Sequence, residues 1–248
     1  MAEQTPAQKL AIVTGAARGI GAAISARLAI AGGLFVIVSD LDGDEAEATA
    51  RSIRASGGKA VAMAADIADR ATFPNLFDQA EALCGGVDVL VNNAGIMVRR
   101  PMVEIDDAMF DRQIAVNLTG TFAGMREAAR RLRDGGRIIN ISSSVAAMRA
   151  ENYSLYGATK AAIETMTAVL AKELRGRNIT VNAVAPGATA TDLFLDGKSE
   201  QAIAAFAKLA PLERIGTPEE IAAVVAFLAG PEGGWINGQT LHANGGVI

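Results

Sequence analysis

Short apolar runs alternate along this chain with longer, alanine-rich amphipathic stretches. The runs have the length and flanking residues of buried strands, and the stretches between them have helical spacing. We expect strands at Leu10 to Thr14, Leu34 to Ser39, Lys59 to Ala64, Val87 to Asn92, Arg137 to Ser142, Asn178 to Val184 and Thr240 to Ala243. We expect helices at Gly19 to Ala31, Gly43 to Ser56, Thr72 to Cys84, Asp107 to Arg133, Tyr156 to Arg175 and Pro218 to Ala229. This alternation predicts an α/β fold with a doubly wound parallel sheet and helices on both faces.

No linker or low-complexity tract divides the alternation, and the chain has 248 residues, of which 50% are hydrophobic. That is enough to bury one large core. We therefore expect one domain over residues 1–248. A polar stretch followed by an apolar helix interrupts the alternation at residues 188–211. An insertion after the carboxyl end of a strand is typical of a substrate lid.

Charge and the scarcity of two residue types narrow the possible functions. The chain has 23 Lys and Arg against 27 Asp and Glu, so no basic surface for nucleic acid or anionic lipid is expected. Cys84 and His242 are the only cysteine and histidine, which argues against a metal site or a histidine-based hydrolase triad. The segment Met1 to Lys9 is polar, and no apolar run is long enough to span a membrane. We expect a cytoplasmic protein that acts on a small molecule.

A glycine-rich turn follows the first predicted strand and opens a helix, with the sequence TGAARGIG at Thr14 to Gly21. Glycines permit a tight turn there and let a pyrophosphate reach backbone N–H groups at the helix N-terminus. The spacing is GxxxGxG rather than GxGxxG. We expect a Rossmann-type dinucleotide site with Gly15, Arg18, Ile20 and Gly21 at the cofactor.

The residue that ends the second strand bears on the choice of cofactor. Asp40 lies about 25 residues after Gly15, close to the separation at which a carboxylate reaches the adenosine ribose. A carboxylate accepts hydrogen bonds from the ribose hydroxyls and repels a 2′-phosphate, which favours NAD(H). Arg18 favours NADP(H) instead, because a guanidinium pairs with phosphate. The sequence predicts NAD(H), with NADP(H) as the alternative.

Residues at the ends of the next two strands extend this site. Asp66 and Ile67 follow the third strand, and Asn93, Ala94 and Gly95 follow the fourth. The carboxyl ends of parallel strands meet at one edge of the sheet. We therefore expect these residues to line the cofactor as well.

Tyr156 and Lys160 are placed at i and i+4 of a predicted helix, so they lie on the same side of it. A free phenol has a pKa of about 10, and a nearby cation lowers it toward a useful range for proton transfer. By themselves the two residues would also suit a surface helix pair. Beside a dinucleotide site they predict a proton donor and acceptor.

Two further polar positions complete the predicted constellation. Ser143 lies within a run of three serines, residues 142–144, where the fifth strand ends, and a hydroxyl there can hold a substrate oxygen near the phenol. Asn117 is polar within an otherwise apolar helical stretch, which suggests a helix kink or a link in a proton relay.

These motifs together resemble the short-chain dehydrogenase/reductase family, in its compact single-domain branch, over essentially the full chain. The resemblance rests on TGAARGIG at Thr14 to Gly21, NNAG at Asn92 to Gly95, VNLTG around Asn117, ISS at Ile141 to Ser143, YGATK at Tyr156 to Lys160 and APGATAT at Ala185 to Thr191. The pattern is most similar to 3-oxoacyl reductases of fatty-acid type and to general ketone or polyol dehydrogenases. One departure is Asn244, where the family usually has an aspartate.

The resemblance implies roles for individual residues. It implies that Tyr156 is the acid/base, that Lys160 binds the nicotinamide ribose and lowers the pKa of the tyrosine, that Ser143 orients the carbonyl, and that Asn117 supports a water relay. It places the nicotinamide end of the cofactor at Pro186, Gly187, Thr189 and Thr191. It also implies a homotetramer.

The expected function is hydride transfer between NAD(H) and a ketone or secondary alcohol. The alternatives are an NADPH-dependent 3-oxoacyl thioester reductase and a non-catalytic, NAD(H)-responsive binding protein. Several apolar residues near the expected site either line a substrate pocket or pack in the core or against another subunit. They are Met97, Val98, Met148, Leu193, Phe194, Leu195 and Phe206. Arg99, Arg100 and Arg149 either recognise a carboxylate, a phosphate or the surface of an acyl carrier, or are solvated loop arginines without such a role.

Overall fold

The computed structural model describes residues 8–248, and the first seven residues of the predicted domain lie outside this range. Its centre is a seven-stranded sheet in the order β3-β2-β1-β4-β5-β6-β7, with every neighbouring pair parallel. The strands are β1 (Leu10–Thr14), β2 (Phe35–Asp40), β3 (Lys59–Ala64), β4 (Val87–Asn92), β5 (Leu132–Ile141), β6 (Thr180–Pro186) and β7 (Thr240–Ala243). The predicted α/β class with a doubly wound parallel sheet is confirmed.

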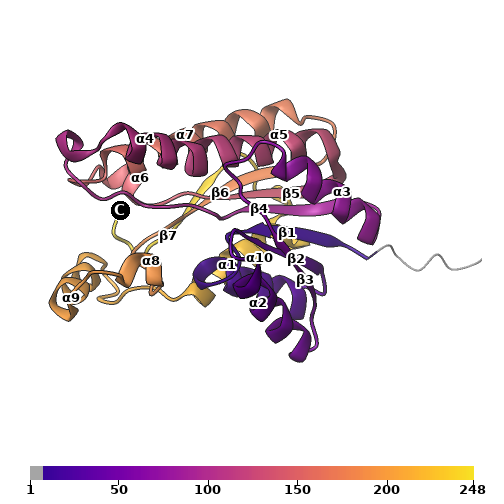
Figure 1. Ribbon diagram of the computed structural model, residues 1–248, viewed down its shortest axis with the longest axis horizontal. Helices are drawn as coiled ribbons and strands as arrows, with labels where there is room; N and C mark the ends of the chain where they lie inside the picture. The colour runs from indigo at the N-terminus through magenta and orange to yellow at the C-terminus, as the bar shows by residue number, and fades with distance from the viewer. Residues whose placement is uncertain (1–7) are drawn as a thin grey trace, which may run out of the picture.

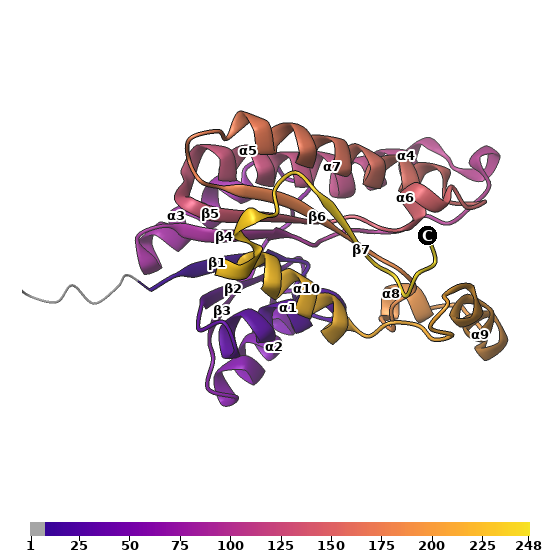
Figure 2. The same ribbon diagram turned by 180° about the vertical axis from the view of Figure 1, so that it is seen from behind.

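Helices cover both faces of the sheet (Figures 1 and 2). One layer contains α3 (Thr72–Cys84), α4 (Asp107–Gln113), α5 (Thr121–Arg131) and α7 (Ser154–Glu173). The opposite layer contains α1 (Gly19–Ile30), α2 (Gly43–Ala55) and α10 (Pro218–Ala229). The shorter segments are η1 (Met102–Glu104), η2 (Ile114–Gly120), α6 (Val145–Met148), α8 (Asp192–Leu195), α9 (Glu200–Leu209) and η3 (Pro231–Trp235).

The central strands β1, β2, β4 and β6 are largely apolar runs because both faces of the sheet are buried there, whereas the edge strands β3 and β7 are only partly buried. Along β1, Leu10 and Ile12 belong to the core beneath α3 and α5, whereas Ala11 and Val13 belong to the core beneath α1 and α10. Successive strand side chains point to opposite faces, so each face needs its own apolar set. A strand with water on one face would instead alternate apolar and polar residues.

One predicted helix is wrong in its extent. The sequence predicts a single helix from Asp107 to Arg133, but the structure has α4, the π-helical segment η2 and α5, and β5 already begins at Leu132. Arg133 explains the early change to strand, because its guanidinium binds the Asp88 carboxylate at 2.8 Å and the carbonyl of Cys84. These bonds hold the start of β5 against β4, where Leu132 pairs with Val87.

The strand order reverses between β1 and β4, and ligands of doubly wound sheets bind beyond the carboxyl ends at such a point. In Figure 1 these carboxyl ends point to the left, where α6, α8, α9 and the C-terminus lie. The predicted lid at residues 188–211 forms α8 and α9 on this side. Within residues 8–248, no helix is long and apolar enough to cross a membrane.

Candidate active site

The glycine turn after β1 is shaped by two close backbone approaches. Gly15 has φ +61°, and a Cβ built on it would lie 2.6 Å from the Cα of Ala94. A Cβ on Gly21 would lie 2.1 Å from the carbonyl oxygen of Gly15. Arg18, the N-cap residue of α1, makes no side-chain cap bond, and the first turn of α1 contains no acidic residue. The N–H groups at this helix end are thus left for an anion such as a pyrophosphate.

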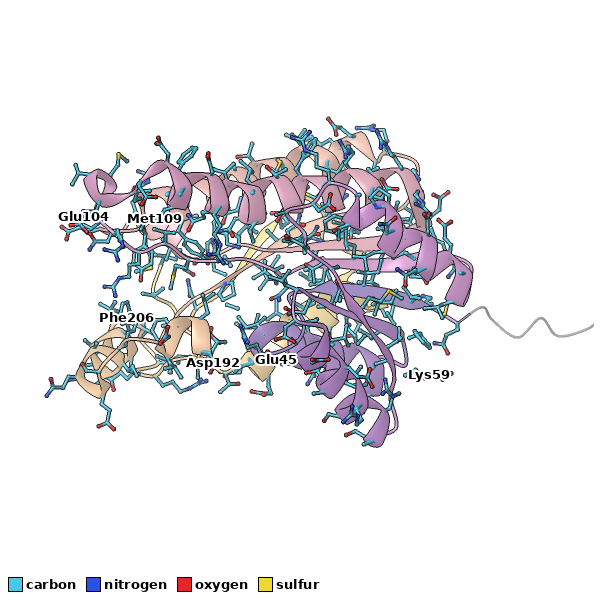
Figure 3. The ribbon with its side chains drawn as sticks, viewed as in Figure 1. Glu45, Lys59, Glu104, Met109, Asp192 and Phe206 are labelled. Atoms are coloured by element: carbon cyan, nitrogen blue, oxygen red, sulfur yellow. The ribbon has the colours of Figure 1, made fainter. Side chains whose placement is uncertain are left out.

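An acidic cavity of about 590 Å³ lies beside the turn, at the end of β2. Its lining residues are Arg18, Asp40, Leu41, Asp42, Gly43 and Asp44. One oxygen of the Asp40 carboxylate accepts a hydrogen bond of 2.9 Å from the N–H of Ala17. The Arg18 guanidinium is paired at 2.7 Å with Glu45, which Figure 3 labels at this edge. The structure therefore brings both predicted cofactor-selecting residues together and shows that Arg18 already has an acidic partner.

Asn93 holds the glycine turn through its side-chain amide. Its amide donates hydrogen bonds to the carbonyls of Thr14 and Gly15 at 2.9 and 2.8 Å. The Thr14 hydroxyl accepts in turn from the N–H groups of Asn93 and Ala94, both at 3.2 Å. Sequence reasoning did not single out Thr14, although a hydroxyl residue closing an apolar strand was a visible signal.

The two residues predicted from the end of β3 differ in environment. Asp66 is exposed, and its carboxylate accepts a hydrogen bond of 2.9 Å from the N–H of Ala68. Ile67 is buried and packs against the η2 segment, since a Cβ on Gly120 would lie 2.8 Å from its carbonyl oxygen. Ile67 is thus tied to the helix that carries Asn117.

Tyr156 and Lys160 are both buried on α7, on the side that faces the sheet edge. The Lys160 ammonium lies 5.6 Å from the centre of the Tyr156 ring and donates a hydrogen bond of 2.7 Å to the carbonyl of Ile141. This bond anchors the lysine to the end of β5, the strand that leads into the three serines.

The contacts of the three serines distinguish them. The Ser142 hydroxyl donates to the carboxylate of Glu164 at 2.7 Å, and the Ser144 hydroxyl donates to the carbonyl of Ala185 at 3.2 Å. Both residues are buried. Ser143 is only half-buried, its hydroxyl oxygen accepts a hydrogen bond of 3.3 Å from the N–H of Val145, and its side chain is near enough to the Tyr156 phenol to affect the pKa of that phenol. Ser143 is therefore the serine placed to share a ligand with Tyr156.

Burial shifts the pKa values of both Tyr156 and Lys160 in the protein without cofactor. Desolvation raises the pKa of Tyr156 to about 12, although the hydrogen bond with Ser143 works in the opposite direction. Desolvation also lowers the pKa of Lys160 to about 8. Burial therefore sets the direction of the tyrosine shift, and Lys160 is not among its causes in the protein without cofactor. At neutral pH the phenol keeps its proton and the lysine is mostly charged.

Asn117 connects three parts of the site from the π-helical segment. Its side chain accepts from the N–H of Ile96 and donates to the carbonyl of the same residue, both at 2.8 Å. A Cβ built on Gly95 would lie 3.4 Å from the Asn117 side-chain oxygen and 3.6 Å from the Lys160 nitrogen. π-Helical turns often mark functional sites. Here the segment brings Asn117 beside Gly95 and Lys160.

The segment after β6 lies between the glycine turn and the predicted lid. Thr189 is buried and donates to the carbonyl of Gly187 at 3.0 Å, directly after Pro186. The methyl group of Thr191 lies over the glycine turn, 3.3 Å from a Cβ built on Gly19. The start of the predicted lid segment is thus adjacent to the predicted cofactor turn.

The tail residue Asn244 also reaches this region. Its amide donates a hydrogen bond of 3.0 Å to the hydroxyl of Ser144. A Cβ on Gly187 would lie 2.8 Å from the Cα of Asn244, so the tail packs tightly against the segment after β6. The departure from the family pattern at this position therefore affects the support of β5 and β6.

Comparison with known proteins identifies the family. The family model described as enoyl-(acyl carrier protein) reductase matches residues 15–248. A short-chain type dehydrogenase/reductase of Picea abies is 44% identical over 97% of this chain and 92% of its own length. The chain is a member of the short-chain dehydrogenase/reductase family. As such it is an oxidoreductase of carbonyl and alcohol groups that uses a nicotinamide cofactor.

The names of two similar proteins mention a nicotinamide cofactor. An Arabidopsis thaliana protein named NADPH-dependent aldehyde reductase 2, chloroplastic, is 40% identical over 98% of this chain and 94% of its own length. The crystal structure of a Burkholderia cenocepacia short chain dehydrogenase in complex with NADP superposes with a TM-score of 0.90, at 39% identity, over 96% of this chain and 97% of that one.

Proposed function

We propose that this short-chain dehydrogenase/reductase transfers hydride between NAD(H) and a ketone or secondary alcohol, with Tyr156 as the acid/base. The observation that carries this proposal is the meeting of Tyr156, Lys160, Ser143 and Asn117 at the sheet edge, next to a glycine turn that admits no side chain. The same edge presents the uncapped N-terminus of α1. When bound there, the nicotinamide supplies or accepts the hydride.

The side chains of the site bind the substrate oxygen, transfer its proton and stabilise the charge that forms. Ser143 and Tyr156 share the substrate oxygen, and the protonated phenol gives its proton to that oxygen during reduction. Lys160 holds a positive charge near the phenolate that forms. Asn117, whose side chain is held by Ile96, fixes the segment next to Lys160 and supports the return of a proton.

The preference for NAD(H) is supported by charge at the end of β2. Asp40, Asp42 and Asp44 line the cavity there, and its one cation, Arg18, is paired with Glu45. A 2′-phosphate would enter an acidic environment whose guanidinium is already engaged. The cofactor names of the Arabidopsis and Burkholderia proteins favour NADP(H), so the two cofactors must be compared directly.

The proposed function is tested by following the absorbance of NADH and NADPH, separately, with purified protein and a panel of ketones, aldehydes, 3-oxoacyl thioesters and sugar alcohols. We expect consumption of NADH with ketones, faster than with NADPH. Faster consumption of NADPH with 3-oxoacyl thioesters would support the alternative reductase. Cofactor binding without turnover of any compound would favour a binding protein.

The pH dependence of the reaction follows from Lys160. Its pKa is lowered to about 8, so its charge is present below that pH and is lost as the pH rises through it. The phenol of Tyr156, with a pKa raised to about 12, stays protonated over the same range. We expect kcat/KM for ketone reduction to fall above about pH 8, because the cation beside the forming phenolate disappears.

A pH–rate profile of ketone reduction measures this effect, with Lys160→Arg as the matched variant. Arginine stays charged to far higher pH, so the fall should move upward or vanish even if the variant is slower. A profile of the unaltered protein that is flat or rising between pH 7 and about 10 would contradict the role of Lys160.

The assembly and location of the protein stay predictions. Large apolar side chains are exposed on the outer helix layer, at Phe110 of α4, Phe122 of α5 and Val169 of α7. Such a surface suits contact with a second copy of the chain. We expect a homotetramer in the cytoplasm, and light scattering would show a mass near four times 25.5 kDa.

A further inference from the structure

Aromatic rings link Tyr156 to the lid helix α9 through one arginine. The ring centres of Tyr153 and Tyr156 lie 6.4 Å apart. The guanidinium carbon of Arg99 lies 5.5 Å from the centre of the Tyr153 ring and 5.8 Å from that of Phe206 on α9. Figure 3 labels Phe206 on the side of α9 that is turned toward the α4 layer. Arg99 therefore lies at the substrate side of the site, between Tyr153 and the lid.

A second cation belongs to the same group. Phe194 meets Phe206 edge to face with ring centres 5.2 Å apart, and the Lys198 ammonium lies 4.6 Å from the centre of the Phe194 ring. Partial burial lowers the pKa of Lys198, repulsion by Arg99 lowers it further, and Asp196 works against this. Within residues 8–248, neither Arg99 nor Lys198 forms an ion pair with a carboxylate. Arg99 and Lys198, one beside the predicted lid and one within it, thus form a pair of cations at this side of the site without an ion-paired carboxylate.

Arg100 and Arg149, the other two arginines expected near the site, have different surroundings from Arg99. Arg100 is paired with Glu104 at 3.5 Å, and Figure 3 labels Glu104 at the outer end of the α4 layer. Arg149 has φ +52° at the end of α6 and lines a cavity of about 420 Å³ together with Glu151, which carries the opposite charge, and Tyr153. Of the three, Arg99 is the one whose guanidinium lies against Tyr153, the ring next to Tyr156.

We propose that Arg99 is a specificity-determining residue, and that it binds the carboxylate of an oxo-acid or hydroxy-acid substrate. The inference rests on the proposed function and names the substrate class of the same site. A planar guanidinium presents a fork of donors that matches a carboxylate, and aromatic faces favour its stacked orientation. Lys198 adds a second positive charge from the lid, while Phe194 and Phe206 offer apolar surface to the body of the substrate.

The distances limit where the carboxylate can be. The Tyr153 ring centre lies 5.5 Å from the guanidinium carbon of Arg99 and 6.4 Å from the ring centre of Tyr156. The distance from Arg99 to the Tyr156 ring therefore cannot exceed the sum of these two distances. The substrate carbonyl must meet Tyr156 while the carboxylate meets Arg99. This upper limit allows a carboxylate directly beside the carbonyl as well as one several bonds away, and a series of oxo acids distinguishes the two cases.

Matched substrates test this inference. A series of oxo acids with increasing distance between ketone and carboxylate is compared with the methyl ester of each acid, using both nicotinamide cofactors. For at least one acid we expect the unaltered protein to favour the acid over its ester. Arg99→Ala should lower kcat/KM for that acid by about 10- to 100-fold, the size expected for a charge-assisted hydrogen bond, and leave the ester within about 3-fold.

Two further variants make the test specific. Arg99→Lys keeps the charge without the fork and should give an intermediate preference for the acid. Arg100→Ala removes an adjacent, paired surface cation and should leave the acid-to-ester ratio unchanged. An equal loss in Arg100→Ala would show a diffuse effect of surface charge and would overturn the assignment to Arg99.

The remaining outcomes separate this inference from the function on which it rests. If esters and neutral ketones are reduced, and Arg99→Ala leaves the acid-to-ester ratio unchanged, the carboxylate inference is wrong and the proposed function stands. If no acid, ester or neutral ketone is reduced with either cofactor, the proposed function fails and the inference fails with it.

Discussion

Tyr156→Phe should lower kcat for ketone reduction by at least about 10³-fold, because it removes the proton donor and leaves the ring in place. Tyr156 is 9% exposed, and phenylalanine fills nearly the same space, so the variant should fold and still bind NAD(H). The measurements are single-turnover kinetics for the chemical step and a titration of cofactor binding. Retained cofactor affinity with lost turnover separates a chemical role from a structural one.

The matched control for this variant is Tyr153→Phe. Tyr153 is also buried, at 7% exposed, and its ring centre lies 6.4 Å from that of Tyr156. Because it has no proposed role in proton transfer, its loss of the hydroxyl should change kcat only a few-fold. Comparable activity of the two variants, or full activity of Tyr156→Phe, would remove Tyr156 from the acid/base role.

Asp40→Asn should lower the ratio of kcat/KM with NADH to kcat/KM with NADPH by about 10- to 100-fold. The amide oxygen can still accept the hydrogen bond from the Ala17 N–H, so the glycine turn should keep its shape. What is lost is the negative charge that binds ribose hydroxyls and repels a 2′-phosphate. The ratio is measured with one carbonyl substrate held constant.

Asp44→Asn is the control for charge in the same cavity. Asp44 lines that cavity, but the turn contact at Ala17 belongs to Asp40. The control should change the cofactor ratio much less than Asp40→Asn does. If the unaltered protein prefers NADPH and Asp40→Asn leaves the ratio unchanged, Arg18 outweighs Asp40 despite its pairing with Glu45, and the preference for NAD(H) is wrong.

The fold could be predicted because each strand is a local apolar run. Four of the predicted strands, such as Lys59–Ala64, have the bounds that the structure shows, and β2 and β6 are displaced by one or two residues. Burial on both faces makes the middle of such a strand easy to recognise in the sequence, whereas its ends are less sharply marked. The start of β5 escaped prediction since it depends on Arg133 binding Asp88, 45 residues away in the chain.

The sequence indicated which residues belong to the candidate site, but it did not indicate which other residues they contact. The run at residues 142–144 offers three identical hydroxyls, and only the structure shows that two of them donate to the distant partners Glu164 and Ala185. The pairing of Arg18 with Glu45 and the contact of Arg99 with Phe206 also join residues far apart in the sequence. Local patterns carry no information about such pairs.

The most direct test of the account follows one deuterium atom. NADH labelled at C4, in each of its two stereochemical forms, is incubated with the protein and a ketone that it reduces. Hydride transfer to a carbonyl predicts deuterium on the carbinol carbon of the alcohol, from one form of the cofactor only. An alcohol without deuterium at its carbinol carbon, or equal transfer from both forms of the cofactor, would contradict the proposed function.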